Sequence, residues 1–495
     1  MSKRKSEFSL PGLIFDKSAA SPLYLQVYEA VRKAILDNRL RPGEQLPPTR
    51  EFAATLGISR TTVLLAFDHL LTEGYITGKT GSGTFVSETI PEKFLEVCAT
   101  ATKETGKTSR KMRLSERGMR MAATANYTQK IRQNLRPFRP GIPALREFPF
   151  ALWSRLSTRQ LKSLSFETFG YGNSAGYQPL REALANYLRI SRAVRCEPAQ
   201  VIITNGSQQA IDLVSRVVLG EGDYIWMEEP GYSGAGETFV GSGVQIAPVP
   251  LDSQGLLIKN GRKICPDARL AYVTPSHQYP LGMTMSLPRR IELLEWAVEK
   301  NAWVLEDDYD SEYRYTGHPI SSLQGLDHQD CVIYMGTFSK VLFPGLSLGY
   351  LVAPSQLVDA LIAARSLSER SSPILEQATL TAFIEEGHFG RHIRQMRVLY
   401  QERQEMLIEN IRKYLDGVIK ICPAATGLQL TAWLNSGDDR QISQRAAEFG
   451  LDVRPLSIYY ADPKNAKPGI VFGYAAFNET EIKNGIITLA KIMKI

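Results

Sequence analysis

A lysine and an aspartate in the C-terminal half of the chain are placed for imine chemistry. Lys340 ends the run GTFSK, so the hydroxyl groups of Thr337 and Ser339 accompany its amine. A lysine amine can form a Schiff base with an aldehyde. Asp307 ends an apolar run, where a carboxylate is costly to bury unless a cation pairs with it, and a pyridinium is a suitable cation. The two residues predict a site for an aldehyde on a protonated ring.

Two further segments supply groups that a phosphorylated ring compound needs. Ser207 and Gln208 follow the apolar run VIIT and open a helix, so their N–H groups can hold a phosphate. Tyr232 follows another apolar run in the sequence EEPGY and can place an aromatic face on the ring. Each segment alone has an ordinary explanation, since a Gly-Ser helix start is usually only a cap. Their joint order and spacing resemble those of fold-type I pyridoxal phosphate (PLP) proteins, and this resemblance implies a PLP site.

The elements that must position these residues alternate along the chain. From about residue 139 to 495, longer amphipathic stretches separate short β-rich runs: VIITNG, YIWME, LAYVTPS, AWVLEDDY, CVIYMG and GYLVAP. Such alternation predicts an α/β domain with a mostly parallel sheet flanked by helices.

The same segments resemble the aminotransferase-like domain of fold-type I PLP proteins, over residues 139–495. The resemblance implies that Lys340 is the Schiff-base lysine, that Asp307 pairs with the ring nitrogen and that Tyr309 meets the ring hydroxyl. It also implies a smaller C-terminal α+β subdomain. It implies that Tyr232 stacks on the ring and that the phosphate is held by Ser207, Gln208, Thr337 and Ser339.

The sequence departs from that family at three places. Ser347, in PGLSLGY, stands where the family has an arginine on the phosphate, which predicts weaker cofactor binding. His277, in SHQYPLG, either replaces the lost asparagine contact or is an ordinary loop histidine. The run IVFGY lacks the arginine that binds a substrate carboxylate, and Arg454 either substitutes for it or meets solvent. The missing anchor argues against efficient transaminase turnover and leaves only residual half-reactions.

The N-terminal segment has the pattern of a DNA reader. Residues 20–87 show three short helices and a two-stranded ribbon with a glycine tip. The last helix of such a unit enters the major groove with its N-terminal residues leading. Ser59 is expected to cap that helix. The residues expected at DNA are Arg60, Thr61 and Thr62 at the start of the last helix, Arg50 on the second helix, and Lys79, Gly81 and Ser82 on the wing.

The run GEQLPPTREFAATLGISRTTV resembles the GntR-type winged helix. One departure is that Val63 and Leu64 follow the Thr-Thr pair where some relatives carry a basic residue. Joined to the aminotransferase-like half, and with the phrase EDDYDSEYRYTGHPISSLQGLD, the chain resembles the MocR regulators. That resemblance implies a homodimer, with the reader of one chain over the cofactor domain of the other and two readers at two DNA half-sites.

Composition sets the remaining expectations. Residues 88–138 are polar and basic, which predicts a flexible linker between the reader (20–87) and the cofactor domain (139–495). The formal net charge of +7 admits an anionic partner but does not require one. The five scattered cysteines have no metal-ligand spacing, and no leader or membrane-spanning run occurs, so a cytoplasmic protein without a metal site is expected.

Taken together, the sequence predicts a PLP-dependent transcription regulator that binds operator DNA. It would sense PLP itself, an amine or an amino acid through the Lys340 Schiff base. One alternative is an aminotransferase that carries a DNA-binding tail. The other is a protein whose aminotransferase-like half binds no cofactor and serves only as a dimerisation scaffold.

Overall fold

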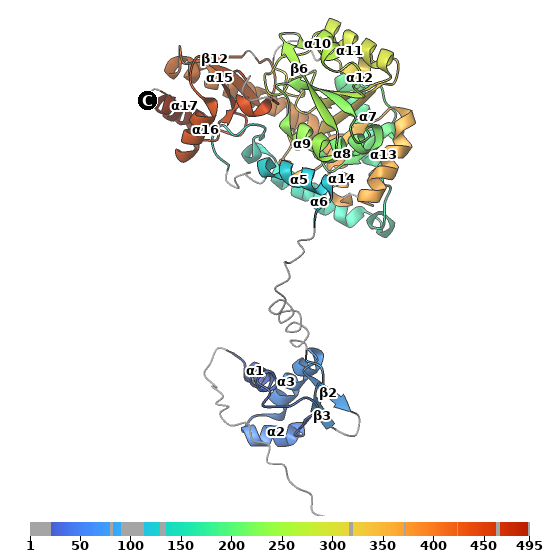
Figure 1. Cartoon of the computed structure of the whole chain (residues 1–495), viewed down its shortest axis with the longest axis vertical. Coiled ribbons are helices and arrows are strands. Elements are labelled where there is room, and N and C mark those ends of the chain that lie inside the picture. The colour runs from blue at the N-terminus through green and yellow to red at the C-terminus, as the bar shows by residue number, and fades with distance from the viewer. Residues whose placement is uncertain are drawn as a thin grey trace, which may run out of the picture. The chain divides into compact units, whose positions relative to one another are not determined.

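The structure is a computed structural model that describes residues 21–79, 83–90, 113–128, 135–315, 320–370, 373–422, 424–461 and 466–493. The chain divides into two units, residues 1–113 and 114–495, and each is described by itself (Figure 1).

The first unit contains three helices and a small antiparallel sheet. Its helices are α1 (Leu23–Leu36), α2 (Thr49–Leu56) and α3 (Arg60–Thr72). Its strands, in the order β1-β3-β2, are β1 (Gln45–Leu46), β3 (Gly83–Val86) and β2 (Ile76–Lys79). This arrangement confirms the predicted winged helix.

Local sequence explains the turn between the second and third helices of this unit. Gly57 ends α2 in the left-handed conformation, with φ of 62°, which glycine adopts at no steric cost. Ser59 then caps α3 as expected, because its Oγ accepts a hydrogen bond from the N–H of Thr62 at 3.1 Å. Phe52 of α2 and Phe67 of α3 meet edge to face in the core, with ring centroids 5.3 Å apart.

The second unit is built on an eight-stranded sheet with the order β4-β11-β10-β9-β8-β5-β6-β7. The strands from β10 to β6 in this order run parallel, while β11 is antiparallel to both β10 and β4. The strand bounds are β4 (Val201–Thr204), β5 (Tyr224–Glu229), β6 (Gln245–Asp252), β7 (Gly255–Leu256), β8 (Leu270–Val273), β9 (Trp303–Asp308), β10 (Val332–Thr337) and β11 (Gly349–Val352).

Helices cover both faces of this sheet. Along β5, the side chains of Ile225 and Met227 enter one apolar cluster, whereas Trp226 enters another. Such alternation is expected of a strand that is buried on both faces. The helices are α6 (Phe150–Ser163), α7 (Gln178–Arg192), α8 (Ser207–Val218), α9 (Ser233–Gly241), α10 (Ile258–Ile264), α11 (Leu287–Lys300), α12 (Leu323–Leu326), α13 (Ser355–Ser368) and α14 (Ile374–Glu385). The predicted parallel sheet between helices is confirmed.

The C-terminal part of this unit forms a smaller α+β subdomain, as predicted. Figure 1 shows it in orange to red, at one side of the larger sheet. Its antiparallel sheet has the order β12-β13-β15-β14. Its elements are α15 (His388–Tyr414), β12 (Ile419–Ile421), β13 (Gln429–Leu434), α16 (Asp439–Glu448), β14 (Arg454–Pro455), β15 (Gly469–Gly473) and α17 (Glu479–Met493).

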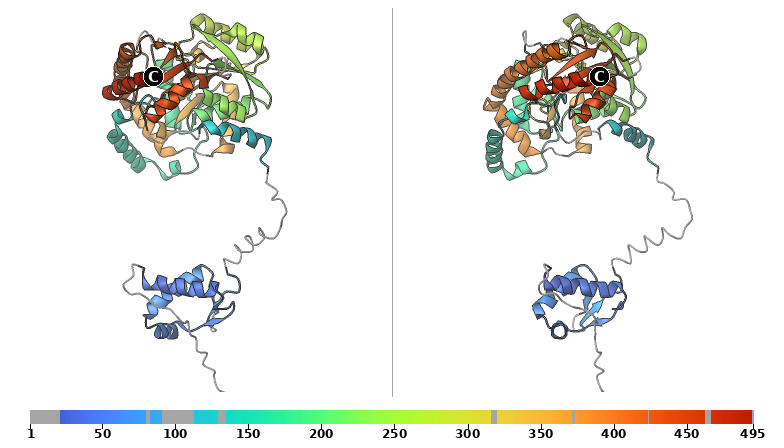
Figure 2. Two further views of the ribbon diagram at one scale, coloured as in Figure 1. Left: turned by 60° about the vertical axis from the view of Figure 1, so that its left-hand side comes forward. Right: turned by 90° about the vertical axis from the view of Figure 1, so that its left-hand side faces the viewer.

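Part of the predicted linker forms a helix. Helix α5 (Glu116–Thr128) lies within residues 88–138 and contacts α9. Figure 1 labels it beside α9, and both views of Figure 2 show it, in cyan, on the outside of the second unit. The guanidinium of Arg120 contacts the Glu221 carboxylate at 2.7 Å. The segment that composition predicts to be a flexible linker therefore contains a short polar helix that packs on a neighbour, which is how such a helix gains stability.

Residues 91–112 and 129–134 of the expected linker lie outside the described residues. No helix in the described ranges is both long and apolar enough to cross a membrane.

Candidate functional site

Pairing between strands brings the predicted site segments together at the ends of neighbouring strands of the large sheet. Asp307 of β9 lies opposite Met335 of the parallel strand β10. At the end of β10, Thr337 pairs with Gly349 of β11, and Gly349 pairs in turn with Thr204 of β4. The lysine segment that follows Thr337 and the phosphate segment that follows Thr204 therefore begin on either side of Gly349.

The amine of Lys340 points to the backbone rather than to solvent. Its Nζ donates a hydrogen bond to the carbonyl oxygen of Gly141 at 2.9 Å, and the side chain is half-buried. A Cβ at position 141 would lie 2.8 Å from Nζ, so glycine leaves room for the amine. Burial lowers the pKa of Lys340, while Asp310 and Asp307 oppose that shift. A lowered pKa favours the neutral, nucleophilic amine.

The Asp307 carboxylate is buried and only partly satisfied. Tyr272 donates a hydrogen bond to its Oδ2 at 2.5 Å. Its Oδ1 has no hydrogen-bond partner among the described residues. Burial raises the pKa of Asp307 to about 7, and the Tyr272 hydrogen bond opposes that shift. A buried acceptor without a partner is costly, and the N–H of a protonated pyridine ring is the group that PLP would offer it.

The predicted phosphate residues are arranged around two glycines. Ser207 is the first residue of α8, after Gly206 with φ of 84°. A Cβ on Gly349 would lie 3.0 Å from the Cα of Gly206, so the absence of a side chain there lets the two segments approach. Thr337 Oγ1 accepts a hydrogen bond from the N–H of Ser339 at 3.2 Å. The N-terminus of α8 and the hydroxyl-bearing residues Thr337 and Ser339 therefore lie in the same region, where a phosphate group could bind.

The side chains of Gln208 and Ser347 are exposed and contact other groups of the protein. Gln208 is exposed, and its side-chain amide donates to the hydroxyl of Tyr232 at 2.9 Å. Ser347 is also exposed, and its hydroxyl lies 3.5 Å from the carbonyl oxygen of Pro344.

Aromatic rings border the site. Tyr279 meets Tyr232 edge to face at 5.6 Å between ring centroids and meets Tyr309 in the same way at 5.9 Å. Tyr309 is buried, and its hydroxyl accepts a hydrogen bond from the Gln429 amide at 3.2 Å. Tyr279 was not expected from the sequence, because nothing in SHQYPLG distinguishes it from a turn residue.

His277 lies in the same cluster and is 2% exposed, which excludes an ordinary surface position. Its Nδ1 contacts the Oδ1 of Asp310 at 2.8 Å and the hydroxyl of Tyr309 at 3.0 Å. Asp310 fixes the proton on Nδ1, because a carboxylate can only accept. A Cβ on Gly427 would lie 2.0 Å from the ring carbon Cε1 of His277, so only glycine leaves room for the imidazole there.

Two charged pairs bear on the sequence predictions. Arg454, which the sequence leaves either at an effector carboxylate or in solvent, directs its Nε to the Asp452 carboxylate at 3.1 Å. Asp308, which the sequence did not single out, forms a buried ion pair with Arg192 at 2.7 Å. The alternation of strand side chains explains why Asp307 and Asp308 face different partners.

The reader presents its expected DNA residues on the surface. Arg50, Arg60 and Thr61 are exposed, and Thr62 is half-buried. Val63 is fully buried in the core of this unit, so the hydrophobic residue after the Thr-Thr pair packs inward instead of facing DNA. Lys79 ends β2, and Gly81 and Ser82 lie outside the described residues.

These two parts define a class of protein: a winged-helix DNA-binding unit joined to an aminotransferase-type α/β unit with a lysine and a buried carboxylate at the ends of neighbouring strands. Residues 23–86 match the bacterial regulatory proteins of the gntR family. Residues 156–485 match aminotransferase class I and II. The chain belongs to the MocR family of transcription regulators.

Similarity to individual proteins extends over nearly the whole chain. The chain is 39% identical to the probable rhizopine catabolism regulatory protein MocR of Rhizobium meliloti, over 96% of this chain and 95% of that protein. It is 34% identical to the uncharacterized HTH-type transcriptional regulator YdeL of Bacillus subtilis, over 96% and 97%. A solved structure of Pyrococcus horikoshii kynurenine aminotransferase, in complex with PMP, has a TM-score of 0.68 at 26% identity and covers 80% of this chain and 98% of that chain.

The aminotransferase class I and II domain is a PLP domain, and the residues present fit that cofactor. The unpartnered Oδ1 of Asp307, the amine of Lys340 and the glycine-lined start of α8 supply what its ring nitrogen, aldehyde and phosphate require. The protein is thus a DNA-binding transcription regulator with a PLP-type domain.

Proposed function

We propose that this regulator senses PLP, or an amine or amino acid that reacts with it, at Lys340, and that the outcome changes how its readers bind operator DNA. The observation that carries this proposal is the combination of a half-buried Lys340 amine and an unpartnered, buried Asp307 oxygen at one sheet edge. PLP supplies an aldehyde and an electron-withdrawing ring when it is bound.

The residues of the chain divide the work of holding the cofactor. Lys340 would bind the aldehyde, Asp307 would accept the ring N–H, and Tyr309 with His277 would face the ring hydroxyl. Tyr232 covers the ring face. The phosphate would be held by the N–H groups of Ser207 and Gln208 at the start of α8 and by the hydroxyl groups of Thr337 and Ser339. Ser347 brings no charge to the phosphate, so affinity rests on these neutral donors.

A regulatory role is favoured over transaminase turnover by the strand that carries the substrate-binding arginine in aminotransferases. Here β15 reads GIVFG, and Ile470, Val471 and Phe472 are fully buried. Arg454 is already paired with Asp452. An effector carboxylate therefore has a weaker anchor than in an efficient transaminase, although Arg454 remains our candidate for it.

A chain of contacts leads from the phosphate segment to α5, a helix within the expected linker. The Gln208 side chain binds the hydroxyls of Tyr232 and Thr238 at both ends of its amide. Tyr232 and Thr238 belong to the start and the body of α9, against which α5 packs. Because α5 lies within the expected linker and packs on α9, a shift of α9 on cofactor binding would move this part of the linker.

We further propose that the protein is a homodimer. Among the described residues of the second unit, four large side chains are almost fully exposed: Phe166 (95%), Tyr171 (86%), Leu367 (85%) and, on α7, Ile190 (89%). The Ser174 hydroxyl donates to the carbonyl oxygen of Arg370, which brings together the segments that carry Phe166, Tyr171 and Leu367. Exposed apolar groups that gather on one surface indicate an interaction site, and a second copy of the chain is the partner that two DNA half-sites require.

The proposed function is tested by spectroscopy and DNA binding on the same preparations. The purified protein is expected to absorb near about 400–430 nm through lysine-bound PLP, and Lys340→Ala is expected to lose that band, whereas Lys162→Ala, an exposed lysine on α6, retains it. Arg60→Ala is expected to weaken salt-dependent binding to upstream DNA, with Lys33→Ala on α1 as the control. A Lys340→Ala protein whose DNA binding responds to PLP and amines like the wild type would refute the sensor, and sustained turnover of amino donors would favour the aminotransferase.

A further inference from the structure

The buried carboxylate of Asp310 lies beside the residues assigned above to the cofactor and faces one side chain. Asp310 is fully buried, and its Oδ1 and Oδ2 lie 2.8 and 3.0 Å from the Nδ1 of His277. Among the described residues, this carboxylate has no other hydrogen bond or ion pair. The imidazole is therefore the group on which its charge acts most directly.

The pairing decides where the imidazole carries its proton. An ionised carboxylate only accepts hydrogen bonds, so the Nδ1 of His277 must be an N–H, whether or not Nε2 is protonated too. The Tyr309 hydroxyl lies 3.0 Å from the same Nδ1 and therefore meets a donor instead of a lone pair. The Gln429 amide is a second donor to the hydroxyl oxygen, at 3.2 Å. Both neighbours thus donate to Tyr309.

Two donors at its oxygen leave the Tyr309 hydroxyl hydrogen without an acceptor in the part of the chain that the structure describes. Tyr309 is buried, and a buried donor that lacks an acceptor is costly. An oxygen on the ring of a bound ligand would be its acceptor, and PLP carries such an oxygen next to its aldehyde group.

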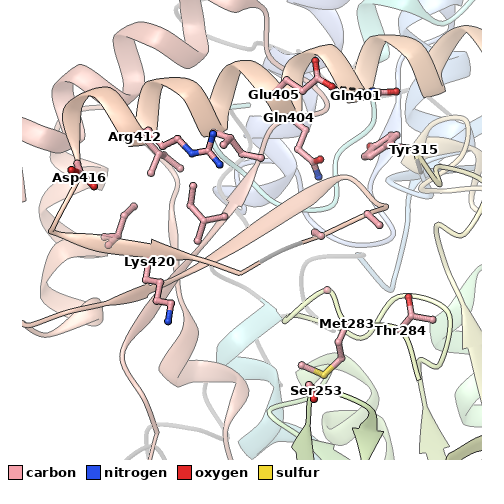
Figure 3. Close-up of a pocket in the computed structure, with 17 residues that line it drawn as sticks. Ser253, Met283, Thr284, Tyr315, Gln401, Gln404, Glu405, Arg412, Asp416 and Lys420 are labelled. Carbon is pink, nitrogen blue, oxygen red and sulfur yellow. Dashed lines mark hydrogen bonds between the residues drawn. The ribbon is translucent and has the colours of Figure 1, made fainter. Parts of the chain in front are cut away.

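The turn at Gly427 holds both members of the pair in place. A Cβ on Gly427 would lie 2.0 Å from the Cε1 of His277 and 2.9 Å from the Oδ2 of Asp310, so the backbone of the turn closes over both side chains. The hydroxyl groups of Tyr315, which lines the cleft shown in Figure 3, and of Tyr474 donate to the carbonyl oxygen of Gly427. These contacts fix the orientation of the imidazole.

We infer that Asp310 is a positioning residue of the cofactor site: by holding the His277 proton on Nδ1, it keeps Tyr309 as a hydrogen-bond donor to an oxygen on the ligand ring. The site thereby selects an aromatic aldehyde that carries an oxygen next to the aldehyde group. An aldehyde without that oxygen would leave the buried Tyr309 hydroxyl unpaired. This inference rests on the proposed sensing of PLP at Lys340 and names what selects the ligand there.

The test compares PLP with 3-deoxypyridoxal phosphate, which lacks that ring oxygen, by titration calorimetry on the full-length protein. The wild type is expected to bind PLP at least about tenfold more tightly than this analogue. Asp310→Ala is expected to reduce the affinity ratio about threefold or more, because His277 can then accept the Tyr309 proton. In the Tyr309→Phe background, the same substitution is expected to lose this effect.

This double-mutant cycle separates the positioning role from the other effects of the Asp310 charge. Burial lowers the pKa of Lys340, and the Asp310 charge opposes that shift. Such direct effects on the amine or the ring are present with and without the Tyr309 hydroxyl, so they cancel when the two backgrounds are compared. Asp439→Ala, which removes a buried carboxylate bound to Ser457, is the control and is expected to keep the wild-type ratio.

Nitrogen NMR of the cofactor-free protein with isotope-labelled histidine reports the position of the proton directly. The chain has six histidines, and the His277 signal is identified by its loss in His277→Gln. The Nδ1 is expected to be protonated in the wild type, whereas a population with an unprotonated Nδ1 is expected in Asp310→Ala. A merely structural role of Asp310 would not change which nitrogen carries the proton.

Three results would overturn the inference: an unprotonated Nδ1 in the wild type, an Asp310→Ala effect on the affinity ratio that is the same in both backgrounds, or an equal effect of Asp439→Ala. Thermal unfolding establishes that each variant is folded, and the isosteric Asp310→Asn, whose amide allows either tautomer, serves if the alanine variant is not. A wild-type protein without the lysine-bound PLP band would refute the proposed sensing. A protein that shows the band with an unprotonated Nδ1 would refute the positioning role alone.

Discussion

Several buried carboxyl groups of the second unit have raised pKa values. They make its free energy of unfolding depend on pH with the opposite sign to that of a carboxylate stabilised by an ion pair. Burial is the largest cause that raises the pKa values of Glu228, Glu306, Asp307 and Glu312, each to about 7. In the cofactor-free protein these groups bind protons in the folded state at pH values where the unfolded chain has released them. Their contribution to the free energy of unfolding therefore falls as the pH rises from about 4 to about 7.

Asp307→Asn tests this cost at the residue that faces the cofactor. Without PLP, the variant is expected to have a free energy of unfolding about 2–4 kcal/mol higher than the wild type at pH 8, because the buried charge is removed. The difference is expected to shrink as the pH falls toward 4, where the carboxyl is protonated in both states. Denaturant unfolding at several pH values measures it, and the absorbance titration is expected to show weaker PLP binding by the same variant.

Asp308→Asn is the matched control, since the neighbouring carboxylate is equally buried but paired with Arg192 at 2.7 Å. Breaking that pair is expected to destabilise the protein by about 3–5 kcal/mol. Equal effects of the two substitutions would contradict the assignment of Asp307 as the unpaired acid.

The sequence predicted the residues of this site that belong to recognisable runs, and it missed those that reach the site through the fold. Lys340 and Asp307 were found because their runs end strands. Their nearest partners, Gly141 and Tyr272, stand 199 and 35 positions away in the chain. Nothing local marks Gly141 as the acceptor for a lysine amine, because only the packed domain brings the two together.

At the scale of elements, the turn before β13 decides whether His277 can occupy its place. Gly427→Ala adds a methyl group 2.0 Å from the Cε1 of His277, at a φ of +99°. Gly437→Ala shares the unfavourable backbone, with φ of +97°, but meets only Ile442 at 3.8 Å. We expect Gly427→Ala to cost about 1–3 kcal/mol more than Gly437→Ala, the added cost of overpacking.

The measurement is urea unfolding of both variants, followed by PLP titration. Gly427→Ala is also expected to weaken PLP binding through displacement of His277, and Gly437→Ala is not. Similar PLP affinities for both variants and the wild type would show that His277 does not support the cofactor.

Helix α5 shows where element prediction from composition fails. Summed over residues 88–138 the charge is high and the aliphatic content low, which is typical of a linker. Yet Met121 lies within contact distance of the position where a Cβ on Gly241 would stand, so one short helix gains order from a neighbour. The composition of a segment shows whether it can bury a core of its own, but it does not show whether the segment packs against a neighbouring element.

Arg120→Glu tests the role of this helix. It places a like charge against Glu221, where the pair is partly exposed and contributes at most about 1 kcal/mol. We expect faster amide hydrogen exchange over residues 116–123 and a smaller change of DNA affinity on adding PLP, with little change in overall stability. Arg117→Glu, at an exposed position on the same helix, is the control. An unchanged PLP response in a protein with a loosened α5 would exclude this route.

At the scale of the whole molecule, a dimer with two readers is expected to bind a DNA fragment with two half-sites more tightly than a fragment with one. Once one reader is bound, the second binds at a high effective concentration, so a two-half-site fragment gains about 10²–10⁴ over a single half-site. The half-sites are expected about one helical turn apart or multiples of it. Because each reader contributes phosphate contacts, the two-site fragment also shows the steeper loss of affinity with salt.

This gain depends on the exposed apolar surface of the second unit if that surface joins the two chains. Phe166→Asp with Leu367→Asp is expected to give a monomer by analytical ultracentrifugation and to remove the gain on the two-site fragment. Its affinity for a single half-site is expected to stay unchanged, because the reader has its own core. Phe449→Asp, which changes another exposed phenylalanine after α16, controls for added charge. A monomeric double variant that kept the full gain would show that the two readers act without the second unit, and a variant that stayed dimeric would move the interface elsewhere.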